Sequence, residues 1–223
     1  MRVRALFVAS VFILLIAAAI VRAQHAPAPA AGPTADAALA ELKAGNEHHA
    51  TKHYDHPHET AERQKELASG QHPHASVLAC ADSRVPPEIV FDQGLGDLFV
   101  IRVAGNVAGD DEVASLEYAA EHLNVSLIVV LGHQKCGGVT AAVQGGEAPG
   151  HLPALMKLLQ PAVEKTKGTA GDAVANAVRA NVEIVVGQLR ASKPILGALV
   201  TAGKMKVVGG VYSLDTGRVD WLK

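Results

Sequence analysis

The strongest constraint on the fold of this chain is an apolar, β-branched run at residues 125–132 (VSLIVVLG), bounded by Asn124 and Gly132. A strand with one face in water alternates apolar and polar residues, whereas a strand covered on both faces is apolar almost throughout. The run is therefore typical of a buried strand in a parallel sheet.

Weaker signals for strands and helices alternate on either side of this run. Helices are predicted from Thr34 to Gly45, at 59–69, after Asp110, after Asp172 and at 194–201. Strands are predicted at 76–81, 98–103, 207–213 and 219–222, the last two joined through a turn at 215–217. This alternation predicts an α/β fold with a mostly parallel central β-sheet, helices on both faces and one antiparallel edge strand.

The first 23 residues have the pattern of a secretory signal peptide. Arg2 and Arg4 precede an uncharged apolar run at 5–21, and small residues stand three and one positions before a cleavage site that follows Ala23. Residues 24–33, rich in Ala and Pro, predict a spacer, and residues 34–223 a single domain. One alternative is a buried core helix. The other, which fits better, is an uncleaved membrane anchor, because the apolar run is close to the lower limit of about 17 residues for crossing a bilayer.

Composition and charge narrow the class of protein further. Apolar residues make up 49% of the chain and aromatic residues only 4%, which favours buried aliphatic strands over a disordered chain. Removal of residues 1–23 changes the formal net charge from -2 to -5, because the segment holds three arginines and no acid. A mildly acidic domain without a basic block argues against nucleic acid as a partner.

A histidine-rich stretch follows the first predicted helix. One interpretation is a zinc-collecting surface for a metal-poor compartment, and the other is a solvated, partly helical connector. The spacing is irregular, and no cysteine or acidic pattern completes a site, so the sequence favours the connector. The histidines are His48, His49, His53, His56 and His58, followed by His72 and His74.

The chain has only two cysteines, and each follows a predicted strand. Two cysteines in a secreted protein usually suggest a disulfide. However, ligands bind at the carboxyl ends of parallel strands, and His133 lies three residues before Cys136, so both side chains can reach one metal ion across a turn. With Cys80 they make a Cys₂His set, which zinc uses in catalytic sites with an open fourth position. A disulfide leaves His133 unexplained.

Asp82 and Arg84 follow Cys80 closely and add a second layer to this site. Two positions apart on an extended segment, they point to one side and can pair. An arginine that holds a carboxylate keeps it ionised and oriented, so Asp82 could accept a proton from water at the metal. An ordinary surface ion pair is the alternative for these two residues alone.

The motif Cys-x-Asp-x-Arg, followed some fifty residues later by His-x-x-Cys-Gly, resembles the signature of the β-class carbonic anhydrases. The resemblance extends over about residues 36–223 and is closest to bacterial members with a plant-type active site. The other segments that carry it are 42–46 (LKAGN), 83–88 (SRVPPE), 91–99 (FDQGLGDLF), 102–106 (RVAGN), 115–118 (SLEY) and the tail at 209–222.

The resemblance implies a zinc enzyme that interconverts carbon dioxide and bicarbonate. It implies one Zn²⁺ per chain held by Cys80, His133 and Cys136, a catalytic dyad of Asp82 and Arg84, and a substrate hydrogen bond from Gln93. It also implies a homodimer or homotetramer with the site near the subunit boundary, in the periplasm if residues 1–23 direct export.

Two positions depart from relatives. Val77 stands where a subset of the family has a tryptophan for regulatory bicarbonate, so that regulation is not expected. Residues 47–49 (EHH) stand where many relatives carry Arg-Phe.

Three alternatives stay open at this point. Relatives of the same fold hydrolyse carbonyl sulfide or carbon disulfide, and no residue of this chain separates those reactions from carbon dioxide hydration. A zinc-stabilised module that binds bicarbonate or metal without turnover is a second alternative, against which Asp82, Arg84 and Gln93 argue. A structural protein with one disulfide is the third alternative, and a bound metal ion in the purified protein would exclude it.

Overall fold

The computed structural model describes residues 32–222, which form one five-stranded sheet with helices packed around it. The predicted signal peptide and residues 24–31 of the predicted spacer lie outside the described residues. Within the described part, none of the helices combines the length and the apolar character that crossing a bilayer requires.

The sheet is mostly parallel with one antiparallel edge strand, as predicted. Its strands are β1 (Ala75–Ala79), β2 (Leu98–Arg102), β3 (Leu127–His133), β4 (Lys206–Tyr212) and β5 (Val219–Trp221), in the spatial order β2-β1-β3-β4-β5. All neighbouring pairs are parallel except β4 and β5, which form the antiparallel edge. Every residue of β3 is buried, as its uninterrupted apolar run predicts.

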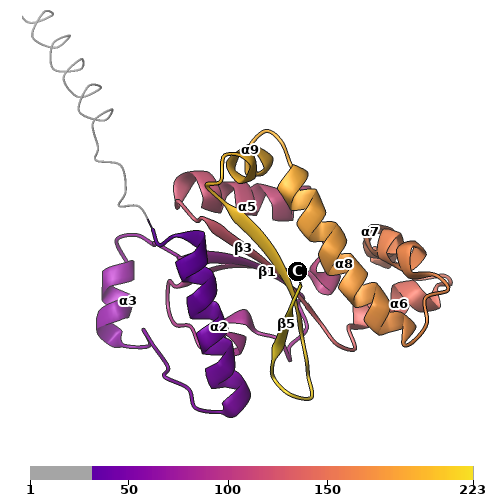
Figure 1. The fold of residues 1–223 in the computed structure, drawn as a ribbon, viewed down its shortest axis with the longest axis horizontal. Helices are drawn as coiled ribbons and strands as arrows, with labels where there is room; N and C mark the ends of the chain where they lie inside the picture. Colours follow the sequence, from indigo (N-terminus) through magenta and orange to yellow (C-terminus); the bar gives the residue numbers. More distant parts are fainter. Residues whose placement is uncertain (1–31, 223) are drawn as a thin grey trace, which may run out of the picture. The chain divides into compact units, whose positions relative to one another are not determined.

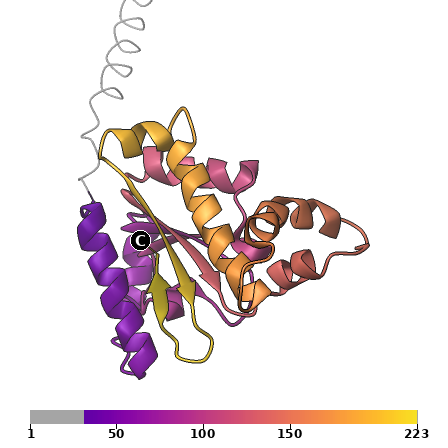
Figure 2. The same ribbon diagram turned by 45° about the vertical axis from the view of Figure 1, so that its right-hand side comes forward.

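Helices cover both faces of this sheet. Odd-numbered residues of β1 and β3 pack toward α2 (Ala35–Thr51) and α4 (Pro87–Val90). Even-numbered residues of β3 pack toward α5 (Asp110–His122), α8 (Ala173–Ala191) and α9 (Leu196–Thr201). Figures 1 and 2 show α2 and α8 on opposite sides of the strands. The period of two along each strand therefore divides the core into two layers.

Two helices in residues 137–166 were not predicted. These are α6 (Gly137–Gln144) and α7 (Leu152–Thr166); α6 begins with two glycines, and α7 contains Pro161 in its interior. Both features lower helix propensity, so these helices depend on tertiary packing. Together with the start of α8 they form a third apolar cluster, which includes Val139, Leu159, Val178 and both cysteines. The remaining helical elements are α3 (Ala61–Leu67), in the region where a helix was predicted, and a short 3₁₀ turn, η1 (Ala104–Asn106).

The end predicted for the first helix was wrong. Thr34 caps α2 by accepting a hydrogen bond from the N–H of Ala37, but the helix continues through Gly45 to Thr51. Gly45 is needed for close packing: a Cβ there would lie 1.7 Å from the carbonyl oxygen of Phe91, just after α4. The glycine marks a helix contact, which local sequence does not distinguish from a helix stop.

Gly45→Ala should therefore destabilise the fold, although alanine is the better helix former. Overpacking usually costs about 1–3 kcal/mol in the free energy of unfolding. We expect at least this loss, because the new methyl group would have to displace the backbone carbonyl of Phe91, which cannot move aside as a side chain can. Gly187→Ala is the matched control, since a Cβ at this position in α8 meets nothing within 4 Å. It should gain up to about 1 kcal/mol from helix propensity. Urea unfolding measures both variants, and equal stability changes would contradict the contact.

Candidate metal centre

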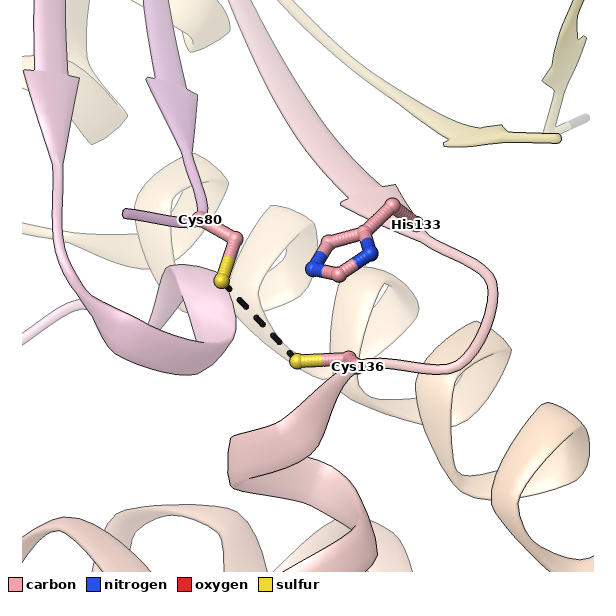
Figure 3. Close-up of side chains that lie close together, drawn as sticks. All are labelled: Cys80, His133 and Cys136. Carbon is pink, nitrogen blue, oxygen red and sulfur yellow. Dashed lines mark hydrogen bonds between the residues drawn. The ribbon is translucent and has the colours of Figure 1, made fainter. Parts of the chain in front are cut away.

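Three buried side chains converge at the carboxyl ends of two neighbouring strands. Cys80 follows the last residue of β1, His133 is the last residue of β3, and Cys136 is the N-cap of α6. Because β1 and β3 pair in parallel, with Ala79 opposite Leu131, their ends lie side by side. Figure 3 shows the three side chains pointing toward one another. Their donor atoms all lie within 4.8 Å of each other.

The two cysteines are free and do not form a disulfide. Their sulfur atoms are 3.9 Å apart (Figure 3), whereas a disulfide requires about 2.05 Å. Two thiolates on a tetrahedral zinc ion, with Zn–S bonds of about 2.3 Å, are separated by about 3.8 Å. The sulfur spacing therefore suits a shared metal ion.

His133 fits this metal ion as its third ligand. Its Nδ1 donates a hydrogen bond to the carbonyl oxygen of Gln134 at 2.9 Å, which leaves the lone pair of the neutral ring on Nε2. That Nε2 is fully buried and has no hydrogen-bond partner among the described residues. Such an unpartnered atom costs about 1–3 kcal/mol, and a bound metal removes this cost. The donor set is one that zinc prefers.

The surroundings favour negative charge on the sulfurs. Without a metal, the hydrogen bond from the Cys136 thiol lowers the pKa of Cys80 to about 4. The N–H of Gly105 also donates to the Cys80 sulfur, at 3.3 Å. The contact with Cys80, together with burial, raises the pKa of Cys136, so the pair carries one negative charge. A divalent ion displaces the remaining thiol proton, because a coordinating thiol is deprotonated.

Asp82 and Arg84 form the predicted pair at the edge of this group. The guanidinium of Arg84 donates to both carboxylate oxygens of Asp82, at 2.9 and 2.7 Å, and the Arg84 backbone N–H donates to one of them. These hydrogen bonds hold the pKa of Asp82 well below its usual range. Asp82 Oδ2 lies 3.8 Å from His133 Nε2, so the ionised carboxylate faces the point where the metal ligands converge.

Comparison with known proteins identifies the family. A family model described as carbonic anhydrase matches residues 75–219. Carbonic anhydrase 2 of Mycobacterium tuberculosis is 39% identical over 186 residues, which cover 82% of this chain and 90% of that protein. The β-carbonic anhydrase CafA of Aspergillus fumigatus has a similar fold, with a TM-score of 0.65 and 30% identity over 84% of this chain and 90% of that one.

This chain belongs to the β-carbonic anhydrase family. Two tetrameric β-carbonic anhydrases from Sordaria macrospora give the same picture of the fold, with a TM-score of 0.65 and 28% identity over 80% of this chain and 90% of theirs. Zinc is the metal of this family, and the buried Cys₂His group of this chain matches that metal.

Within this β-carbonic anhydrase site, sequence analysis assigned no role to Arg102 or Asn181. The Arg102 side chain donates to the carbonyl oxygens of both Cys80 and Asp82, at 3.1 and 2.5 Å, and so holds a metal ligand and the dyad in one loop. Asn181, buried in α8, donates to the carbonyl of Gly105, whose N–H contacts the Cys80 sulfur. Arg102 lies in the RVAGN segment that carries the family resemblance, whereas nothing in the sequence marks Asn181.

Gln93 is the one predicted site residue that the structure does not bring to this group. It is buried after α4, where its amide nitrogen donates to the carbonyls of Phe91 and Asp92 at 3.1 Å each. Its Oε1 has no partner among the described residues. Gln93 borders an open hollow of about 440 Å³ lined also by Glu88 and Leu95, and no hydrogen bond in the described part joins it to the metal ligands.

The protein should hold one tightly bound zinc ion per chain after extensive dialysis. Thiol titration after denaturation and chelation, without reductant, should find two thiols. Loss of a residue that only supports a ligand weakens metal binding about 10- to 100-fold. Because Cys136 would bind the metal directly, Cys136→Ser should weaken zinc binding by more than about 100-fold. Mass spectrometry for metals measures the zinc content of the parent and of Cys136→Ser after dialysis. A protein with neither zinc nor free thiols would contradict the assignment of the ligands.

Proposed function

We propose that this chain is a working carbonic anhydrase, in which the metal group of Cys80, His133 and Cys136 serves the conversion of carbon dioxide and water to bicarbonate and a proton. The zinc-dependent, reversible hydration of carbon dioxide is the reaction of the family. The observation that carries the proposal for this chain is the unpartnered Nε2 of His133, which faces two thiols and an ionised carboxylate.

Zinc, when bound, supplies a Lewis acid that makes water a nucleophile near neutral pH. Asp82 would orient a water molecule at the point where the three ligands converge and would accept its proton on a carboxylate oxygen. Arg84 fixes the aim of Asp82 through two parallel hydrogen bonds, and Arg102 fixes its backbone. Because its pKa is low, Asp82 keeps a proton only briefly and passes it to solvent. Its side chain is 16% exposed, so water reaches it directly.

We further propose that the protein is a homodimer or homotetramer and that a second copy covers the face around β2. This edge strand has only half-buried apolar side chains, and exposed edges of this kind favour pairing with another chain. Ile89, Leu95 and Tyr118 each leave about half of their surface exposed around it. Gln93 borders the hollow on this face, so it would hydrogen-bond substrate at the metal group of the partner copy.

Export to the periplasm is the remaining part of the proposal. It rests on the signal-peptide pattern of residues 1–23, with the uncleaved anchor as the alternative outcome.

Replacement of Asp82 by Asn tests the reaction directly. General-base assistance is typically worth about 10² to 10⁴ in rate, and the low pKa of Asp82 places the expected loss toward the lower end. Stopped-flow hydration of carbon dioxide should show this loss with zinc content unchanged. Asp215→Asn is the matched control, because Asp215 is exposed and, among residues 32–222, forms an ion pair with Lys135 alone. If Asp82→Asn hydrates carbon dioxide as fast as the parent, the role of Asp82 is wrong; a zinc-loaded parent without turnover would indicate a binding module.

The mature form should begin at or near Gln24 and contain more than one copy of the chain. Denaturing mass spectrometry of protein isolated from cells reports the first residue, and native mass spectrometry of the same sample reports the number of copies. A chain that begins at Met1 in the membrane fraction would replace export by anchoring. A native mass of one copy would contradict the assembly.

A further inference from the structure

Three side chains meet near the end of α2, and none of them belongs to the metal centre described above. His48 lies in the last turn of α2, Asp55 in the loop that follows, and Asp92 directly after α4. Their donor atoms lie within 4.8 Å of one another. Asp55 belongs to the histidine-rich stretch itself, but Asp92 is 44 residues from His48, so only the fold completes the cluster.

The spacing of these donors suits one small cation. His48 Nδ1 lies 3.0 Å from Asp92 Oδ2 and 3.4 Å from Asp55 Oδ2. Donors at about 2.0–2.1 Å from a tetrahedral zinc ion are about 3.3 Å apart. Since Nδ1 faces two carboxylates, it carries the ring hydrogen when no metal is bound, and a metal ion takes the place of that hydrogen.

The charges around this cluster are unbalanced. Among residues 32–222, no Lys or Arg forms an ion pair with Asp55 or Asp92, and His48 is their only basic partner. Asp97, a second buried carboxylate of the same region, is contacted by both Arg63 and His58. Of these two buried aspartates, Asp97 therefore has an arginine partner. Asp92 has none among the described residues and lies beside the exposed Asp55.

Asp92 is also held in place before any ion binds. The N–H of Asp55 donates to its Oδ2 at 2.8 Å and the N–H of His56 to its Oδ1 at 3.2 Å. Burial opposes ionisation of Asp92, but these N–H groups and His48 outweigh it and hold its pKa below the usual value. Each carboxylate oxygen has a second lone pair, so Oδ2 remains able to bind a cation. Asp55 is three-quarters exposed, which leaves room for water to complete the coordination.

We propose that His48, Asp55 and Asp92 form a second site for a divalent transition-metal ion, with zinc as the ion of choice. Imidazole and carboxylate donors suit zinc, and the absence of thiolate makes the site weaker than the Cys₂His group. The ion joins the end of α2 to the segment that carries Gln93, whose amide donates to the Asp92 carbonyl. The site is independent of the proposed reaction.

Zinc binding to the full mature chain tests the site. Protein dialysed to one tight zinc per chain should take up one further zinc in equilibrium dialysis. Loss of an outer-shell partner alone weakens metal binding about 10- to 100-fold. We therefore expect His48→Ala and Asp55→Asn to weaken the second zinc by at least 10-fold and to leave the first in place. Zinc beyond one equivalent should also raise the melting temperature of the parent, since it binds the folded state, but not that of Asp55→Asn.

His53→Ala is the matched control. His53 is exposed in the same stretch, and its side chain makes no hydrogen bond or ion pair within the described residues. Uptake of only one zinc by the parent would overturn the proposal. So would an equal loss in His53→Ala and His48→Ala, which would indicate unspecific binding by the histidine-rich stretch. Cys136→Ser should lose the first zinc and keep the second, so failure of one site is distinguishable from failure of the other.

Discussion

Strands β1 and β3 pair in parallel at the centre of the sheet, and this pairing assembles the metal centre. The two strands are 48 residues apart along the chain, between Ala79 and Leu127, yet their carboxyl ends lie side by side in the sheet. This pairing places Cys80 next to the end of β3, where His133 emerges. A shift of the register by one residue would turn the side chains of a strand to the other face and separate the ligands. The buried apolar layers on both faces hold the register, so the core of the sheet also sets the geometry of the metal centre.

The metal centre concentrates polar groups in apolar surroundings. The two thiols belong to the cluster formed by α6, α7 and α8, and His133 is fully buried. Burial of such groups without partners opposes folding, and the protein reduces that cost through the N–H of Gly105, the carbonyl of Gln134 and the guanidinium of Arg102. Among the three ligand side chains, Nε2 of His133 has no hydrogen-bond partner within residues 32–222, and it is the atom that a metal ion would satisfy. The same low polarity strengthens the interaction of a bound ion with Asp82.

The histidine-rich stretch shows that residues close in sequence can have different fates. His49 is buried between the hydroxyl groups of Tyr54 and Tyr212, which contact its two ring nitrogens at 2.9 and 2.8 Å. His48, the preceding residue, points to Asp55 and Asp92. His53 remains in solvent. A solvated, partly helical connector describes only some of this segment, because each side chain takes its environment from the sheet and helices around it and not from its sequence neighbours.

Local sequence patterns were enough to predict the class of fold, the central strand, the antiparallel edge and five side chains that the structure brings to the metal centre. These depend on local patterns: β-branched runs, alternation of strands with helices, and the placement of Cys80, Asp82, Arg84, His133 and Cys136 at or just after the ends of strands. Other features became visible only in the packed molecule: α2 continues through Gly45, α6 and α7 are helices, Arg102 and Asn181 support Cys80, and Gln93 lies apart from the ligands of its own chain. Each of these depends on contacts between residues far apart in the sequence, such as Gly45 with Phe91, 46 residues on, and Asn181 with Gly105. Local propensity carries no information about such contacts, because their energy exists only after the strands have paired and the helices have packed on them.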